Sequence, residues 1–139
     1  WEIQTQKSVM TIKIPASEYS QYKPGFFPVA ISPDNSKILF TYSLNPDARI
    51  ATVCSIPDGK ELYRISEYYA AFSPDSSMIA ASVGDNVIRF YDSKTGEQIG
   101  EVNGKYPNKN GFQLLYFSED GKSLIAVSTN GTISVWGIP

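Results

Sequence analysis

Ser73-Pro74-Asp75 is the stretch that decides the fold, because it recurs within the 139 residues. The same triplet stands 41 residues earlier as Ser32-Pro33-Asp34, and a weaker form stands 45 residues later as Ser118-Glu119-Asp120. Apolar segments precede and follow each triplet at matching distances, so the chain is built from repeats. We expect each aspartate to form a hairpin turn, in which its side chain accepts hydrogen bonds from its own backbone.

The repeats predict short strands. The segments 51–54, 88–91 and 133–136 align with one another, and each alternates apolar and polar residues, as a half-buried strand does. Turns such as Asp58-Gly59 and Thr95-Gly96 separate the strands, and no helical apolar period persists. The sequence therefore predicts an all-β chain. Four short antiparallel strands recur about every 40 to 45 residues, which is the pattern of β-propeller blades.

One repeat runs from Phe72-Ser73-Pro74-Asp75 through Val87 to Asp92 and on to Thr95-Gly96, and Asn130 to Trp136 repeats its end. These segments resemble repeats of the tryptophan–aspartate (WD-repeat) propeller family. The chain departs from that family because it has no histidine. The Gly-His pair that opens family repeats is therefore absent, and the buried hydrogen-bond network built on that histidine cannot form. At the positions of the family's Trp-Asp pair, this chain has Trp1-Glu2, Cys54-Ser55, Tyr91-Asp92 and Trp136-Gly137.

The expected strands amount to three blades, whereas propellers typically have four to eight. We assign residues 1–14 to the end of a preceding blade, 27–66 and 67–103 to full blades, and 112–139 to three strands of a last blade. Because Trp1 aligns with the end of a third strand, we expect the C-terminal part of a longer propeller. The alternative is a ring of two copies. In both cases the remaining blades or a second copy are partners, and the segment alone is not expected to be a stable monomer.

Composition excludes several kinds of function. Without histidine there is no Ser-His-Asp triad and no imidazole metal site, and the single Cys54 rules out internal disulfides and cysteine-pair zinc sites. The unpaired thiol favours a reducing, cytoplasmic location. A net charge of −2 and the absence of a long apolar run argue against nucleic acid and membrane partners. The spacing Ser20-x-x-Lys23 lies in a loop without the supporting motifs of serine acyl enzymes. We therefore expect no catalysis, no metal and no cofactor.

What remains is binding through loops. Our main hypothesis is a non-catalytic protein-interaction scaffold or sensor module. The alternative is the accessory gating propeller of a prolyl-oligopeptidase-type serine hydrolase whose catalytic domain lies outside this chain. The first repeat, with its insertion at residues 44–48, is equally similar to such propellers. Long connections are expected at residues 13–26, 43–48 and 103–111, on the side opposite the Ser-Pro-Asp turns. They hold the candidate protein-binding residues Tyr19, Tyr22, Lys23 and Tyr106. Tyrosine is common at binding hot spots, but these rings could equally pack their own loops against the blades.

Overall fold

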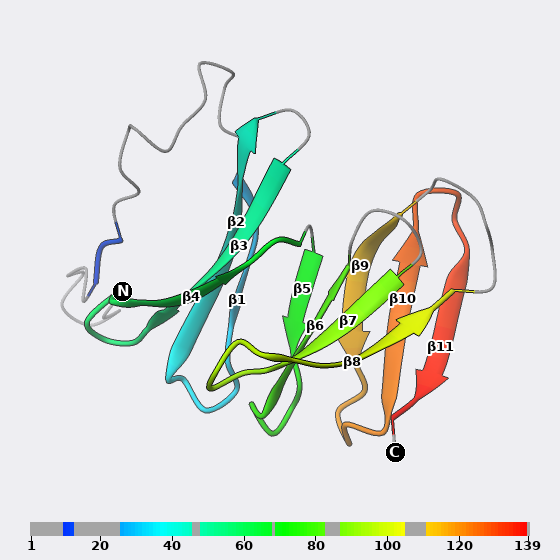
Figure 1. Cartoon of the computed structure of the whole chain (residues 1–139). Helices are drawn as coiled ribbons and strands as arrows, with labels where there is room; N and C mark the ends of the chain where they lie inside the picture. The colour runs from blue at the N-terminus through cyan, green and yellow to red at the C-terminus, as the bar shows by residue number, and fades with distance from the viewer. Residues whose placement is uncertain are drawn as a thin grey trace, which may run out of the picture.

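The computed structural model describes residues 10–12, 26–45, 48–67, 69–82, 87–104 and 111–138. These residues hold eleven strands and no helix. The strands form three separate antiparallel sheets, in each of which neighbours in sequence are neighbours in space (Figure 1). The predicted all-β class, with three blades' worth of short antiparallel strands, is confirmed.

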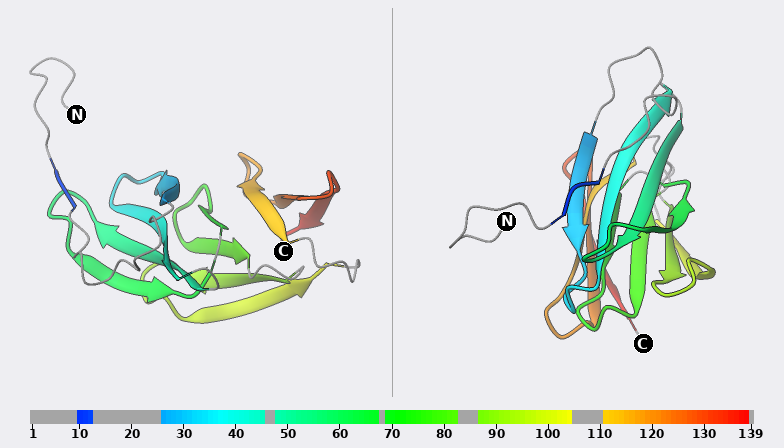
Figure 2. Two further views of the ribbon diagram at one scale, coloured as in Figure 1. Left: turned by 90° about the horizontal axis from the view of Figure 1, so that it is seen from above. Right: turned by 90° about the vertical axis from the view of Figure 1, so that its left-hand side faces the viewer.

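The sheets follow one another in chain order across the molecule (Figure 2). The first contains β1 (Phe26–Ile31), β2 (Lys37–Asn45), β3 (Ala48–Ser55) and β4 (Glu61–Ile65). The second contains β5 (Tyr69–Phe72), β6 (Met78–Ser82), β7 (Val87–Asp92) and β8 (Gln98–Asn103). The third contains β9 (Phe112–Phe117), β10 (Ser123–Ser128) and β11 (Ile133–Gly137).

The β2–β3 hairpin is longer than the sequence indicated. The prediction of a long loop over residues 43–48 is wrong, because β2 continues to Asn45 and β3 begins at Ala48. Ser43 pairs with Arg49, and Asn45 pairs with Ala48 after a register shift. Antiparallel pairing satisfies the backbone N–H and C=O groups of these residues, so the two strands extend further than we expected.

The three Ser-x-Asp turns have the same internal bonding. In each one, the serine hydroxyl donates to the aspartate at 2.6 Å, and the aspartate also accepts a backbone N–H at 3.0 Å. The Ser32 hydroxyl, followed by the bonds from Ser36, lowers the pKa of Asp34 to about 2. Equivalent bonds lower the pKa of Asp75 and of Asp120. The expectation that these aspartates form hairpin turns is therefore confirmed.

Hydrogen bonds also join each sheet to the next. The backbone N–H of Asp34 donates to Ser76 Oγ at 3.0 Å, which ties the first turn to the second. Ser76 has a φ of 63°, which lies in the left-handed region that is unfavourable for residues other than glycine. Further along, the Tyr63 hydroxyl donates to the Ser93 carbonyl at 2.6 Å, and the Ser82 hydroxyl donates to the Phe112 carbonyl at 3.3 Å.

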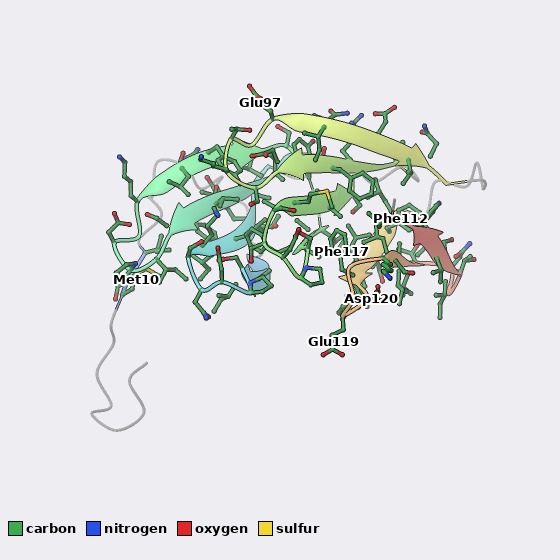
Figure 3. The ribbon with its side chains drawn as sticks, turned by 90° about the horizontal axis from the view of Figure 1, so that it is seen from below. Met10, Glu97, Phe112, Phe117, Glu119 and Asp120 are labelled. Carbon is green, nitrogen blue, oxygen red and sulfur yellow. The ribbon has the colours of Figure 1, made fainter. Side chains whose placement is uncertain are left out.

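Two apolar cores lie between the sheets. The first joins Leu39 and Val53 of the first sheet to Ile79 and Ala81 of the second. The second lies between the second and third sheets, where Phe112 packs edge to face on Trp136 and Phe117 contacts the core from its margin (Figure 3). Alternate residues of β6 enter different cores, so both faces of the middle sheet are buried, as predicted for a blade between two neighbours.

Candidate functional site

The four predicted binding residues fall outside the described part of the chain. Tyr19, Tyr22 and Lys23 belong to residues 13–25, and Tyr106 belongs to residues 105–110. The strand ends on both sides of the second segment are described: β8 ends at Asn103 and β9 begins at Phe112. Because the strands are antiparallel, both ends lie on the side opposite the Ser-Pro-Asp turns.

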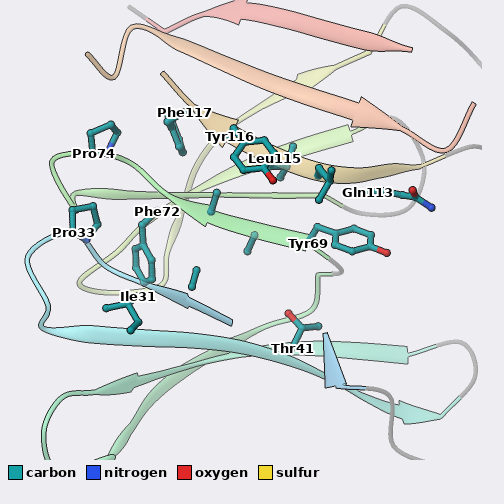
Figure 4. A pocket seen from close by; sticks show the side chains of 14 residues that line it. Ile31, Pro33, Thr41, Tyr69, Phe72, Pro74, Gln113, Leu115, Tyr116 and Phe117 are labelled. Carbon is teal, nitrogen blue, oxygen red and sulfur yellow. The ribbon is translucent and has the colours of Figure 1, made fainter. Parts of the chain in front are cut away.

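A pocket of about 530 Å³ opens along the first strand of each sheet. These strands, β1, β5 and β9, are each the edge strand of their sheet, and β5 contacts both of the others. Three prominent side chains of the pocket wall are Phe72, Leu115 and Phe117, one from β5 and two from β9 (Figure 4). Ile31 and Tyr116, which also line the pocket, are largely exposed to solvent.

The two ends of the pocket differ in chemistry. Pro33 and Pro74, the prolines of the first two turns, line one end (Figure 4). The other end holds the side chains of Tyr69 and Gln113, near the starts of β5 and β9. None of the described residues that line the pocket carries a charge. The pocket therefore suits an uncharged, mainly apolar group that can reach an amide and a phenol at one end.

Sequence reasoning did not predict this pocket. It identified the segments 29–31, 70–72 and 115–117 as the apolar stretches that precede the three Ser-x-Asp triplets, and it predicted no pocket there. The available signal was their place as the first strand of each repeat, since the first strands of neighbouring sheets lie next to one another at the sheet edges. An apolar residue on such an edge can face an open pocket rather than a neighbouring sheet.

Comparisons with known proteins show which proteins share parts of this sequence and this fold. Residues 68–92, which include β5, β6 and β7, match the family described as WD domain, G-beta repeat. WD repeat-containing protein 1 from Xenopus tropicalis is 34% identical over 67 residues, which make up 48% of this chain and 11% of that protein. Residues 68–92 thus match a WD repeat. The solved structure of U3-55K is similar in fold, with a TM-score of 0.70 at 16% identity, over 88% of this chain and 40% of that one.

WD-repeat propellers are generally non-catalytic scaffolds that bind protein partners. The matched part of this chain spans 11% of WD repeat-containing protein 1 and 40% of U3-55K. Among the residues that the structure describes, no cluster of side chains could hold a metal ion. The described residues also include no helix that could cross a membrane.

A buried carboxylate network stands at the start of the matched WD repeat. Glu67 immediately precedes the matched residues 68–92 and is almost fully buried. The Tyr91 hydroxyl donates to Glu67 Oε1 at 2.6 Å, and Arg89 Nη1 approaches the same oxygen at 3.3 Å. Burial, followed by the bond to Glu67, raises the pKa of Tyr91. This WD repeat thus links its opening loop to its third strand without histidine.

Cys54 has the environment expected of an inert thiol. It lies on β3 and is buried. Desolvation, aided by the charge of Glu61, raises the pKa of the thiol above its usual value. A thiol with a raised pKa is rarely ionised at neutral pH and reacts slowly.

Proposed function

We propose that this chain is a non-catalytic protein-interaction scaffold or sensor module within a longer WD-repeat-like propeller. The observation that supports this most is the pocket along β1, β5 and β9. It offers an uncharged, largely apolar surface on sheets that two cores and three hydrogen bonds hold together. Rigid sheets that display an apolar recess are suited to hold a partner, because little conformational entropy is lost on binding.

We further propose that the partner contacts the side of the sheets opposite the Ser-Pro-Asp turns. The polar end of the pocket lies on that side, because Tyr69 and Gln113 are near the starts of their strands. The described strand ends next to the segments that carry the candidate residues Tyr19, Tyr22, Lys23 and Tyr106 are the start of β1, the end of β8 and the start of β9, and all three lie on this side. A partner that enters this end of the pocket would therefore meet these residues as well.

Replacing Tyr22 or Tyr106 with alanine in the full-length protein is expected to weaken partner binding by roughly 1–3 kcal/mol with little change in melting temperature. The physical reason is that a tyrosine contributes a large apolar area and few rotatable bonds to an interface. The measurement is quantitative affinity purification from the protein's own cells, with thermal unfolding of each purified variant.

Leu62→Ala is the matched control. Leu62 is an exposed apolar residue on β4, an edge strand of the first sheet, so its loss should change neither partner recovery nor melting. If both tyrosine variants lose thermal stability and neither loses its partners, the rings are structural and the binding surface lies elsewhere.

A further inference from the structure

The turn between β10 and β11 has the bonding of a Ser-x-Asp turn, but it holds an asparagine. Asn130 follows Ser128 by two residues. The Ser128 hydroxyl donates to Asn130 Oδ1, and the backbone N–H of Thr132 donates to the same oxygen at 3.0 Å. In all three Ser-x-Asp turns, one aspartate oxygen accepts the same pair of bonds, from the serine two residues before it and from the N–H two residues after it. Asn130 therefore occupies the position of an aspartate.

The backbone of this turn also matches that of the Ser-x-Asp turns. Gly131 follows Asn130 with a φ of 81°, and Gly121 follows Asp120 with a φ of 71°. Asn130 and Gly131 are both exposed, and a Cβ built on Gly131 would meet nothing within 4 Å. The peptide bond between Asn130 and Gly131 is therefore open to water and uncrowded.

An asparagine that precedes glycine can lose its side-chain amide without an enzyme. The glycine backbone nitrogen attacks the side-chain carbonyl carbon, and the missing glycine side chain removes the main hindrance to this attack. The carbonyl oxygen becomes an oxyanion in the tetrahedral intermediate. At Asn130 that oxygen is Oδ1, to which the Ser128 hydroxyl and the Thr132 N–H already donate. Donors held in place in this way stabilise a developing oxyanion.

One bond of the turn opposes the reaction. The Gly131 N–H donates to the Ser128 carbonyl at 3.0 Å, so this bond opens before the nitrogen attacks. An exposed turn opens locally at a small cost in free energy compared with unfolding of the whole protein. The two donors to Oδ1 are separate from this bond, since they are the Ser128 side chain and the Thr132 backbone.

We propose that Asn130 is a self-modification site, at which the chain converts this asparagine to aspartate by deamidation. The Gly131 nitrogen gives up its proton and bonds to Asn130 Cγ, the Cγ–Nδ2 bond breaks, and ammonia leaves. Water then adds to Cγ of the resulting succinimide and breaks the new N–Cγ bond, which restores the peptide and leaves a carboxylate. One water is consumed, one ammonia is released, and the chain, whose net charge is −2, gains one negative charge.

The turn favours aspartate over isoaspartate as the product. Water that adds to the other carbonyl of the succinimide gives isoaspartate, which lengthens the main chain by one carbon. That change disrupts the bond from the Ser128 N–H to the Thr132 carbonyl, 2.9 Å long, at the end of the hairpin. Aspartate keeps the backbone and fits the bonds already present. In the equivalent turn the Ser118 hydroxyl lowers the pKa of Asp120, so these donors favour a carboxylate.

The test is incubation of the folded full-length protein at mildly alkaline pH, followed by peptide mass spectrometry with fragmentation that distinguishes aspartate from isoaspartate. We expect Asn130 to be converted mainly to aspartate. The same protein in urea should give mainly isoaspartate at this position, as unstructured Asn-Gly peptides do. Asn103-Gly104, an exposed pair at the end of β8, is the internal reference and should give mainly isoaspartate in both conditions.

Ser128→Ala removes one of the two donors to Oδ1. It should slow conversion of Asn130 about tenfold, because one oxyanion donor is lost, and should raise the proportion of isoaspartate. Ser118→Ala is the matched control: it removes the equivalent hydroxyl from the turn of Asp120 and should change neither quantity at Asn130. Asn130→Asp should not lower the melting temperature, since aspartate fits the same bonds.

Three results would overturn the proposal. One is an Asn130 that stays intact in the folded protein while it is converted in urea. Another is an excess of isoaspartate at Asn130 in the folded protein, equal to that at Asn103. The third is faster conversion in Ser128→Ala, which would show that the turn protects Asn130. The first two need no variant, and none of the three depends on partner binding, so the proposed function can fail or hold independently.

Discussion

Replacing Glu67 with alanine is expected to lower the free energy of unfolding by about 2–4 kcal/mol, because a buried hydroxyl loses its acceptor and a buried ion pair is broken. Tyr91 is a buried residue whose hydroxyl donates to the Glu67 carboxylate, which also accepts from Arg89. Without Glu67, Arg89 still contacts solvent and Glu101. The loss of stability is therefore smaller than for a fully buried charge that is left without a partner. Urea unfolding followed by tryptophan fluorescence measures the change.

Glu101→Ala is the control for this experiment. Arg89 lies between the two carboxylates: Glu67 is 2% exposed, and Glu101 is 46% exposed with its Oε2 3.6 Å from Arg89 Nε. An exposed ion pair contributes at most about 1 kcal/mol, so Glu101→Ala should have little effect. The loss of stability for Tyr91→Phe should lie between those for Glu67→Ala and Glu101→Ala, since this variant removes one hydrogen bond of about 1 kcal/mol and leaves the ion pair. Equal losses for Glu67→Ala and Glu101→Ala would contradict the role assigned to the buried carboxylate.

The strands and turns could be predicted because local chemistry and the repeat agree. Ser32, Ser73 and Ser118 each donate to an aspartate two residues later, a bond that needs only neighbouring residues. Alternation in segments such as 88–91 predicted a strand, and β7 spans Val87–Asp92. The same logic failed at residues 43–48, where strand pairing outweighed turn-forming residues.

The contacts between sheets could not be predicted in this way. Glu67 stands in the polar stretch Ser66-Glu67-Tyr68, and nothing local shows that Tyr91, 24 residues later, supplies its donor. The left-handed φ of Ser76 is equally hidden, because Ser76 Oγ accepts from Asp34, 42 residues earlier. For the candidate site, the sequence showed which strands are apolar, but not which of their residues face the pocket. The predicted residues Tyr19, Tyr22, Lys23 and Tyr106 stay a prediction.

Gly96 is the position where a single methyl group is expected to disturb the contact between the first and second sheets. Its φ of +75° lies in the left-handed region, where a Cβ costs roughly 1–2 kcal/mol. A Cβ built there would also lie 2.5 Å from Cδ2 and 2.7 Å from Cγ of Tyr63. That ring cannot easily move away, because its hydroxyl donates to Ser93. Burial, followed by the charge of Asp92, raises the pKa of Tyr63 to about 12, so the donor persists at neutral pH.

Gly96→Ala should therefore destabilise the protein by about 2–5 kcal/mol, the sum of the backbone cost and of overpacking. Gly131→Ala is the matched control: its φ is +81°, but nothing lies within 4 Å of the added Cβ, so only the backbone cost of roughly 1–2 kcal/mol applies. Tyr63→Ala should remove the overlap, so that Gly96→Ala costs no more than Gly131→Ala when both are made in that background. Urea unfolding of the three single variants and the two double variants measures this. If Gly96→Ala lowers the free energy of unfolding equally with and without the Tyr63 ring, the added methyl group does not act through this ring and the prediction is wrong.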